Sequence, residues 1–118
     1  MKLDHINLTV HDVVEAASFL KKHFAFVDVF DDNTPEITAL RVPGGMAVLL
    51  MKGSGAAYPK MFHIGFDLET KDAVNAHYER LIQAGIVTDA PDSGWGSWTF
   101  NFKCPGGNFI IEVACTDS

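Results

Sequence analysis

The sequence predicts an α+β fold made of two βαβββ modules, and three observations support this prediction. First, Leu3-Asp4-His5-Ile6 returns as Met61-Phe62-His63-Ile64, 58 positions later (63 − 5). Second, Pro43-Gly44-Gly45 returns as Pro105-Gly106-Gly107, 62 positions later (105 − 43). Third, each half reads as strand, helix, strand, strand, strand. An internal repeat of this kind describes architecture directly, because each copy is one supersecondary unit.

The first module is expected over about residues 1–52. Residues 3–10 alternate between apolar and polar side chains, which predicts a strand. Asp12 is placed to cap a helix, with Glu15 three residues later as in a capping box. Val13, Ala17 and Leu20 then recur at helical spacing. The remaining strands are expected at 27–30, 37–42 and 46–51.

A linker of small and turn-forming residues at 53–60 separates the modules. The second module, about residues 61–118, repeats the order of the first. Thr70 is the expected N-cap of its helix and Gly85 its C-terminal stop. The expected strands are 61–68, 86–88, 97–103 and 108–115, with a loop rich in Asp, Pro and Gly at 89–96.

Length and composition describe one domain, residues 1–118, because modules of about 60 residues are too small to stand comfortably alone. The chain is 47% hydrophobic and 20% charged, as in ordinary globular proteins, and its net charge is −6. A negative charge disfavours nucleic acid and anionic membrane partners. No apolar run approaches a spanning helix, and the N-terminus does not resemble a signal peptide. Cys104 and Cys115 are expected to be reduced thiols in a cytoplasmic protein.

The parity of the strands predicts a site. Residues two apart share one face of a strand, so Ile6, Leu8 and Val10 belong to the helix-covered face and His5 to the opposite face. The same reasoning places His63 opposite its aliphatic neighbours. It also places Glu112 opposite Ile111 and Val113. Two histidines and one glutamate are therefore expected on the faces that no helix covers.

Two imidazoles and one carboxylate on rigid strands can hold a divalent cation on one side and leave other positions open. The sequence therefore predicts His5, His63 and Glu112 as metal ligands. Asn7 and Thr9 share a face with His5, and Asp67 shares a face with His63; these side chains can support the ligands by hydrogen bonds. Asp67 is the one carboxylate placed near the site as a weak candidate base, so no catalytic base is assigned.

These segments resemble the glyoxalase / bleomycin resistance / dioxygenase superfamily, also called vicinal oxygen chelate proteins. The resemblance rests on the two His-containing segments and on Pro105 to Val113, which is similar to the family's turn followed by its metal-binding Glu. It covers essentially the whole chain. It implies a glyoxalase-like fold, in which the strands of the two modules form a curved, eight-stranded mixed sheet shaped like a cup. It also implies a divalent metal, a small-molecule substrate and a homodimer.

The branch of the family is left open. Glyoxalase I has a fourth ligand, a Glu in the first module, and the 62-residue offset puts Leu50 at that position (112 − 62). A leucine cannot bind a metal, so a standard four-ligand glyoxalase I is not expected. Ring-cleaving dioxygenases typically carry four modules. Fosfomycin-type transferases use a Tyr where this chain has Phe102, and the extra carboxylates of the epimerases have no secure match.

The resemblance also implies an apolar pocket. The face shared by Trp98, Phe100 and Phe102 is expected to look inward, joined by Leu50, with Asn7 as a polar member and Trp95 as a lid. The same aromatic residues equally suit an ordinary core.

Two functions follow from these observations. The first is a metal-dependent enzyme with one divalent ion per chain (Fe, Mn, Co, Ni or Zn) that acts on a small molecule through its vicinal oxygens, by dioxygenase, isomerase, lyase or group-transfer chemistry. The second is a bleomycin-resistance-like protein that sequesters a flat antibiotic or other small molecule without catalysis. The presence of all three ligands favours the first.

Overall fold

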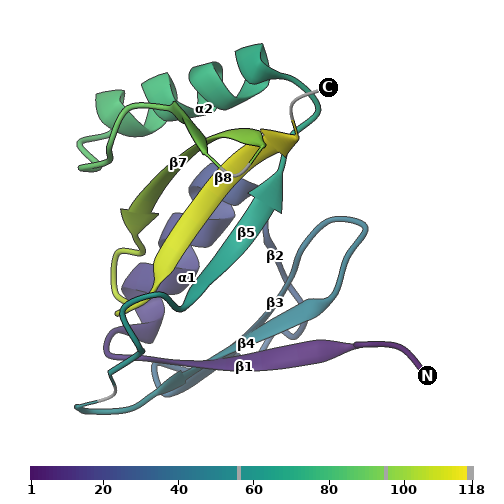
Figure 1. Cartoon of the computed structure of the whole chain (residues 1–118). Helices are drawn as coiled ribbons and strands as arrows, with labels where there is room; N and C mark the ends of the chain where they lie inside the picture. The colour runs from purple at the N-terminus through teal and green to yellow at the C-terminus, as the bar shows by residue number, and fades with distance from the viewer. Residues whose placement is uncertain (56, 95, 117–118) are drawn as a thin grey trace. The chain divides into compact units, whose positions relative to one another are not determined.

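The computed structural model describes residues 1–55, 57–94 and 96–116 (Figure 1). The described residues form an α+β structure with two helices and eight strands in the order βαβββ-βαβββ. The chain separates into two compact units. The first contains residues 1–57 and 104–108, and the second contains residues 58–103 and 109–118. The α+β class and the two βαβββ modules are thus confirmed, but the eight strands of the described residues lie in two four-stranded sheets and not in one, because each strand pairs only within its own module.

The first unit contains one helix and a four-stranded sheet, here called sheet A. Its strand order is β1-β4-β3-β2. β1 pairs with β4 in parallel, and the other neighbours are antiparallel. The elements are β1 (His5–Val10), α1 (Val13–Phe24), β2 (Val27–Asp28), β3 (Ile37–Arg41) and β4 (Ala47–Lys52).

The second unit repeats this arrangement in sheet B, whose strand order is β5-β8-β7-β6. β5 pairs with β8 in parallel, as β1 pairs with β4. Each unit therefore has its own four-stranded mixed sheet. The elements are β5 (His63–Asp67), α2 (Lys71–Gln83), β6 (Asp92–Gly94), β7 (Ser97–Lys103) and β8 (Ile110–Thr116).

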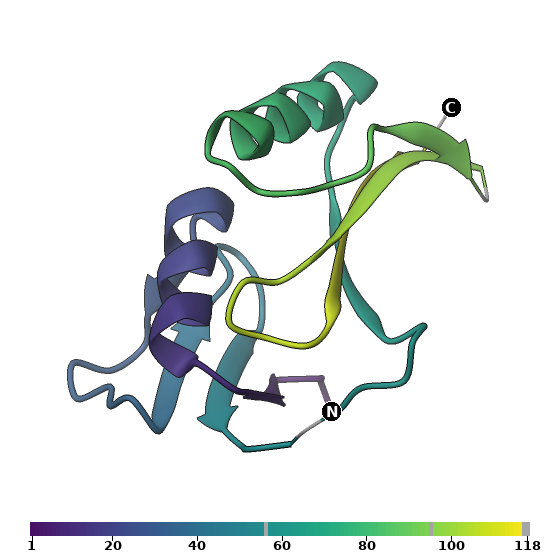
Figure 2. The same cartoon turned by 90° about the vertical axis from the view of Figure 1, so that its left-hand side faces the viewer.

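Both helices begin where their caps predict. The Asp12 carboxylate accepts a hydrogen bond from the Glu15 amide at 3.0 Å, and the Thr70 hydroxyl accepts one from the Ala73 amide at 3.0 Å. α1 packs on β3 and β4, and α2 packs on β7 and β8. Each helix covers one face of its own sheet (Figure 2). The face of each sheet that its own helix does not cover is called the open face below.

Two expected strands differ from the structure. The strand expected at 27–30 pairs only over Val27–Asp28. The strand expected at 86–88 lies instead at Asp92–Gly94, inside the segment expected to be a loop. The cause is local pairing: a short hairpin sets Gly94 opposite Ser97 and Asp92 opposite Thr99, so the residues nearest β7 in sequence become its partner.

The turn between β7 and β8 belongs to the first unit, although both strands belong to the second. The Gly106 carbonyl accepts hydrogen bonds from the His11 and Asp12 amides at 3.1 and 3.0 Å, just before α1 begins. Gly106 has φ +81°, and a Cβ there would lie 2.6 Å from the Asp12 carbonyl oxygen. Glycine is therefore required both by the conformation and by the space.

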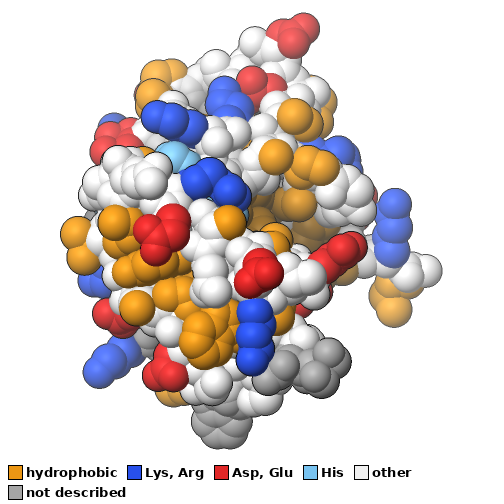
Figure 3. Space-filling model, turned by 90° about the horizontal axis from the view of Figure 1, so that it is seen from above, with side chains coloured by type: hydrophobic (Ala, Val, Ile, Leu, Met, Phe, Trp, Pro, Cys, Tyr) orange, Lys and Arg blue, Asp and Glu red, His pale blue; other side chains and the backbone are white. Residues whose placement is uncertain are grey.

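The surface mixes charges of both signs. On the face shown in Figure 3, basic side chains lie beside acidic ones, with apolar side chains between them. Within the described residues, neither α1 nor α2 is long and apolar enough to cross a membrane.

Candidate metal centre

His63 and Glu112 come together on the open face of sheet B. β5 and β8 run in parallel, with His63 paired to Ile110 and Gly65 paired to Glu112. Gly65 presents no side chain opposite Glu112, which leaves the glutamate free to lean toward His63. The His63 Nε2 lies 3.9 Å from the Glu112 Oε1. The structure thus brings an imidazole nitrogen and a carboxylate oxygen close together.

The hydrogen bonding of His63 fixes which ring nitrogen is available. Its Nδ1 lies 3.0 Å from the Met61 carbonyl oxygen. A carbonyl oxygen can only accept, so Nδ1 carries the hydrogen and Nε2 keeps its lone pair when the ring is neutral. That lone pair belongs to the nitrogen nearer Glu112. Metal-binding histidines are commonly oriented by this kind of bond to the second nitrogen.

The spacing of the pair suits a metal after a small adjustment. Nitrogen and oxygen ligands lie roughly 2.0–2.2 Å from Zn²⁺, so two ligands of a tetrahedral ion are about 3.3–3.6 Å apart. The observed 3.9 Å exceeds this by less than an ångström. Both side chains are partly exposed, at 49% and 32%, and have room to move. The pair can therefore supply two of the ligands of a divalent cation.

A cavity of about 550 Å³ adjoins the pair, entirely within the second unit. Asn101 stands directly opposite Glu112 in the register between β7 and β8. The remaining polar lining is Asp89, Asp92, Ser93 and Thr99. The cavity is rich in hydrogen-bonding groups and is large enough for a small molecule.

His5 lies in the first unit, on the open face of sheet A. Its Nδ1 is 3.3 Å from the Asp4 carboxylate, so its Nε2 is also the unengaged nitrogen. It borders a second cavity of about 260 Å³. His5 is thus placed in one unit and the His63–Glu112 pair in the other. Within the described ranges, no three His, Cys, Asp or Glu side chains group closely enough to hold a metal.

The aromatic residues expected in the pocket lie mainly on the helix-covered face. Trp98, Phe100 and Phe102 pair with Cys115, Val113 and Ile111, which are all buried on that face. The Trp98 indole donates to Asn75 of α2 at 2.9 Å, and the Phe100 ring meets Tyr78 of α2 edge-on.

These contacts correct the expected pocket. Trp98 and Phe102 are not among the residues lining the cavity beside Glu112, and Phe100 borders it although only 1% exposed. The polar residues alternating with them, such as Thr99 and Asn101, occupy the open face. That alternation was the available signal. Trp95, expected as a lid, lies outside the described residues.

Leu50 is also on the helix-covered face. It pairs with Leu8 and is fully buried. The 62-residue offset does not hold along the last strand of each module, because two residues separate the Pro-Gly-Gly turn from β8 and only one separates it from β4. The register therefore makes Leu49, opposite Asn7, the counterpart of Glu112. Leucine again occupies the position, so the missing fourth ligand is unaffected by this correction.

The remaining candidates lie on the open faces. Asn7 shares the face of His5, and its amide donates to the Met51 sulfur at 2.6 Å. Asp67 lies at the far end of β5 from His63 and does not line the adjoining cavity. Reasoning from sequence missed two supporting groups, Asp4 beside His5 and the Met61 carbonyl beside His63.

The fold and this site define an α+β protein with two copies of a βαβββ module and an imidazole–carboxylate pair beside an open cavity. Residues 2–111 match the model of the Glyoxalase/Bleomycin resistance protein/Dioxygenase superfamily, and the chain belongs to that superfamily.

Solved structures give the same picture of the fold. A possible glyoxalase from Bacillus cereus is 37% identical, with a TM-score of 0.88 over 98% of this chain and 99% of that one. A superfamily enzyme from Burkholderia phytofirmans PsJN is 18% identical, with a TM-score of 0.82 over 98% and 99% of the two chains. The fosfomycin resistance protein FosX from Listeria monocytogenes, complexed with Mn(II) and sulfate, is 19% identical, with a TM-score of 0.80 over 97% and 89%. No curated protein sequence matches the chain.

Proposed function

We propose that this protein is a divalent-metal-dependent enzyme of the vicinal oxygen chelate type, with His5, His63 and Glu112 as the metal ligands. The observation that carries the proposal is the His63–Glu112 pair. The Nδ1 hydrogen of His63 is engaged by the Met61 carbonyl, and its Nε2 lies 3.9 Å from the Glu112 carboxylate. An imidazole held in this tautomer beside a carboxylate suits a cation better than it suits a structural role.

His5 is the proposed third ligand. Its Nδ1 is engaged by Asp4, so it offers the same nitrogen as His63 does. Two histidines and a carboxylate leave coordination positions open, and the bound ion supplies Lewis acidity toward vicinal oxygens of a substrate. The ligand set suits one Fe, Mn, Co, Ni or Zn ion per chain. The presence of Mn(II) in the FosX structure from Listeria supports a divalent cation in this fold.

The residues around the pair would bind and orient the substrate. Asn101 offers an amide opposite Glu112, and Thr99 offers a hydroxyl on the same face. Asp89 and Asp92 accept hydrogen bonds from hydroxyl groups of a polar ligand. Oxygenase, isomerase, lyase and group-transfer reactions all use such an arrangement. The four-ligand set of glyoxalase I is not proposed, because Leu49 stands where the fourth ligand would be.

The alternative function, sequestration of a flat antibiotic without catalysis, has less support. It relied on an aromatic groove formed by Trp98, Phe100 and Phe102. Those rings lie on the helix-covered face, where Trp98 contacts Asn75 of α2 and Phe100 contacts Tyr78 of α2. The open face of sheet B is polar instead, and polar groups suit a chelating substrate.

We also infer a homodimer that works in the cytoplasm. Exposed apolar side chains such as Val27 of β2 and Ile37 of β3 lie on sheet A, where a second copy can cover them. Cys104 and Cys115 are free thiols, as expected in a reducing compartment.

The metal content of the purified protein tests the proposal. We expect about one divalent ion per chain by elemental analysis of protein prepared without chelator or affinity tag. His5→Ala, His63→Ala and Glu112→Ala should each weaken metal binding by more than the roughly 10–100-fold that is typical of losing an outer-shell partner.

Matched controls remove the same kinds of side chain elsewhere. His11→Ala and Glu79→Ala alter exposed residues outside the proposed site and should retain the metal. A protein that neither contains nor takes up a divalent ion would overturn the proposal. Equal metal content in the control and ligand variants would assign the ion to another site.

A further inference from the structure

We propose that the cavity beside His5 binds the carboxylate of a singly charged, largely apolar ligand through Arg41. This inference deepens the proposed function, on which it rests for the identity of the metal ligand beside the cavity. The cavity itself lies wholly within the first unit, so its chemistry can be argued from that unit alone.

The strand register places Arg41 across the sheet from His5. His5 pairs with Ala47 of β4, and Arg41 of β3 pairs with the same Ala47. Paired residues direct their side chains to the same face, so His5, Ala47 and Arg41 form one row on the open face of sheet A. Neighbouring strands are about 4.8 Å apart, which puts the backbones of His5 and Arg41 about 10 Å apart. Ala47 leaves only a methyl group between them.

Arg41 has N–H donors that can bind a ligand. One Nη1 hydrogen bond goes to the Gly45 carbonyl oxygen at 3.2 Å, which steadies the guanidinium at the rim of the cavity. A guanidinium carries five N–H donors in a planar fork that matches a carboxylate. Within the described part of the chain, no carboxylate forms an ion pair with Arg41. An incoming carboxylate would therefore not have to displace one.

The rest of the cavity is mostly apolar. Its apolar lining is Val29, Phe30, Ala39, Ala47 and Leu49. Phe30 is 60% exposed, which leaves much of its ring free to cover a ligand. An arginine at one side of an apolar cavity selects a ligand that joins an anionic group to an apolar body.

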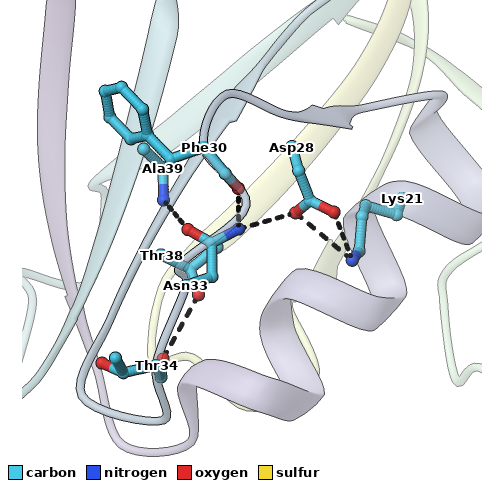
Figure 4. A network of polar contacts seen from close by, with 7 residues as sticks. All are labelled: Lys21, Asp28, Phe30, Asn33, Thr34, Thr38 and Ala39. Carbon is cyan, nitrogen blue, oxygen red and sulfur yellow. Dashed lines mark hydrogen bonds and ion pairs between the residues drawn. The ribbon is translucent and has the colours of Figure 1, made fainter.

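The wall that carries Phe30 is held in place before any ligand arrives. The Asn33 amide donates to the Phe30 carbonyl at 3.1 Å and to the Asp28 carboxylate at 2.9 Å, and its oxygen accepts from the Ala39 amide at 3.1 Å (Figure 4). Lys21 of α1 closes the network by pairing with Asp28 at 3.2 Å. Two residues of the lining, Phe30 and Ala39, are thereby tied to one side chain.

Charge favours a carboxylate over a phosphonate or phosphate. Arg41 can neutralise one negative charge, and the remaining charged side chain at the cavity is Asp4, which is itself acidic and lies 3.3 Å from His5. A phosphate-type group carries about 1.5 to 2 negative charges at neutral pH. In the metal-free protein the second charge would lack a partner and would face Asp4. We therefore assign a carboxylate with a single charge.

Three probes of similar shape test the assignment: phenylacetate, its neutral amide phenylacetamide, and benzylphosphonate. Each is titrated into the isotope-labelled full chain after chelator treatment, and amide chemical shifts are recorded. We expect phenylacetate to shift amides of β1, β3 and β4 around His5, Leu49 and Arg41. Phenylacetamide and benzylphosphonate should bind more weakly. Arg41→Gln should weaken phenylacetate binding roughly tenfold or more, since a charge-assisted contact is lost.

Two variants control the test. Arg80→Gln removes the same charge from α2 and should leave binding unchanged. Arg41→Lys keeps the charge without the fork, so intermediate binding is expected, and it serves if Arg41→Gln fails to fold. Equal binding of acid and amide, tighter binding of the phosphonate, shifts confined to other residues, or unchanged binding in Arg41→Gln would each overturn the proposal.

A second titration tests the proposed metal site independently of the carboxylate site. Mn(II) added to the same labelled protein should broaden amides near His63 and Glu112. Because the carboxylate test uses metal-free protein, failure of either titration leaves the other interpretable. Loss of Mn(II) broadening would count against the proposed function, and loss of phenylacetate binding would count against the role of Arg41.

Discussion

At the scale of single residues, the two histidines share one feature that sequence does not reveal. Each has its Nδ1 next to an oxygen acceptor, the Asp4 carboxylate for His5 and the Met61 carbonyl for His63. Each therefore presents Nε2. The ligand residues could be predicted from the repeat and from strand parity, because side chains alternate along a strand with a period of two. The acceptors could not, since one of them is a backbone group.

Cys104 has a chemical environment that predicts a dependence of stability on pH. Burial, helped by the negative charge of Glu15, raises the pKa of its thiol from the ordinary 9.0 to about 12. The unfolded chain releases this proton near pH 9, whereas the folded chain retains it. The free energy of unfolding should therefore be fully maintained below pH 9 and should fall as the pH rises toward 12.

The measurement is urea denaturation at pH 8 and pH 10. The loss attributable to Cys104 should be about 1 kcal/mol between these values. Cys104→Ala should show a flatter profile than the unchanged protein, and Cys115→Ala serves as the control with Cys104 intact. Identical pH profiles for the unchanged chain and Cys104→Ala would show that this thiol does not control stability.

At the scale of secondary structure, most elements could be predicted because their signals are local. The caps at Asp12 and Thr70 and the alternation of 5–10 each involve neighbours in sequence. The errors arose where pairing with another strand decides. The face of β7 is set by its register with β8, and the sequence pattern alone allowed Trp98, Phe100 and Phe102 to face either way. The short pairing of β2 likewise depends on tertiary contacts.

Gly106 provides a test of how tightly the β7–β8 turn meets the start of α1. Alanine there must adopt φ +81° and place its Cβ 2.6 Å from the Asp12 carbonyl oxygen. Gly44, its counterpart in the repeat, has φ +71° but no atom within 4 Å. We expect Gly44→Ala to cost about 1 kcal/mol from backbone strain alone. Gly106→Ala should cost at least ~3 kcal/mol, because backbone atoms must also shift.

Urea denaturation of the two variants gives the comparison directly. The difference between them isolates the close approach, since both glycines share a left-handed conformation. Equal costs would mean that the turn can move away from α1 without penalty.

At the scale of the whole molecule, each sheet presents its own open face with its own chemistry. The face of sheet A carries His5 and Arg41 with apolar neighbours, and that of sheet B carries His63, Glu112 and polar neighbours. The repeat predicted two modules of the same topology, with a leucine in the first at the position of Glu112 in the second. The single extra residue before β8 and the exchange of glutamate for Leu49 make them chemically unequal.

The assembly state is a prediction at this scale. We expect light scattering to give twice the chain mass of 12.9 kDa, because apolar side chains remain exposed on sheet A, among them Val27 and Ile37. The distribution should be independent of salt if burial of apolar surface drives association. A mass of one chain at micromolar concentration would contradict this expectation.

The turn at residues 104–108 has a consequence for protein engineering. A cut in the linker near residue 57 follows the sequence repeat, but it does not follow the packing, because the fragment that starts there still carries a piece of the other unit. The two modules are therefore not interchangeable cassettes. Recombination with a related protein should keep α1 and residues 104–108 from the same parent, so that the first turn of α1 keeps its close contact with Gly106.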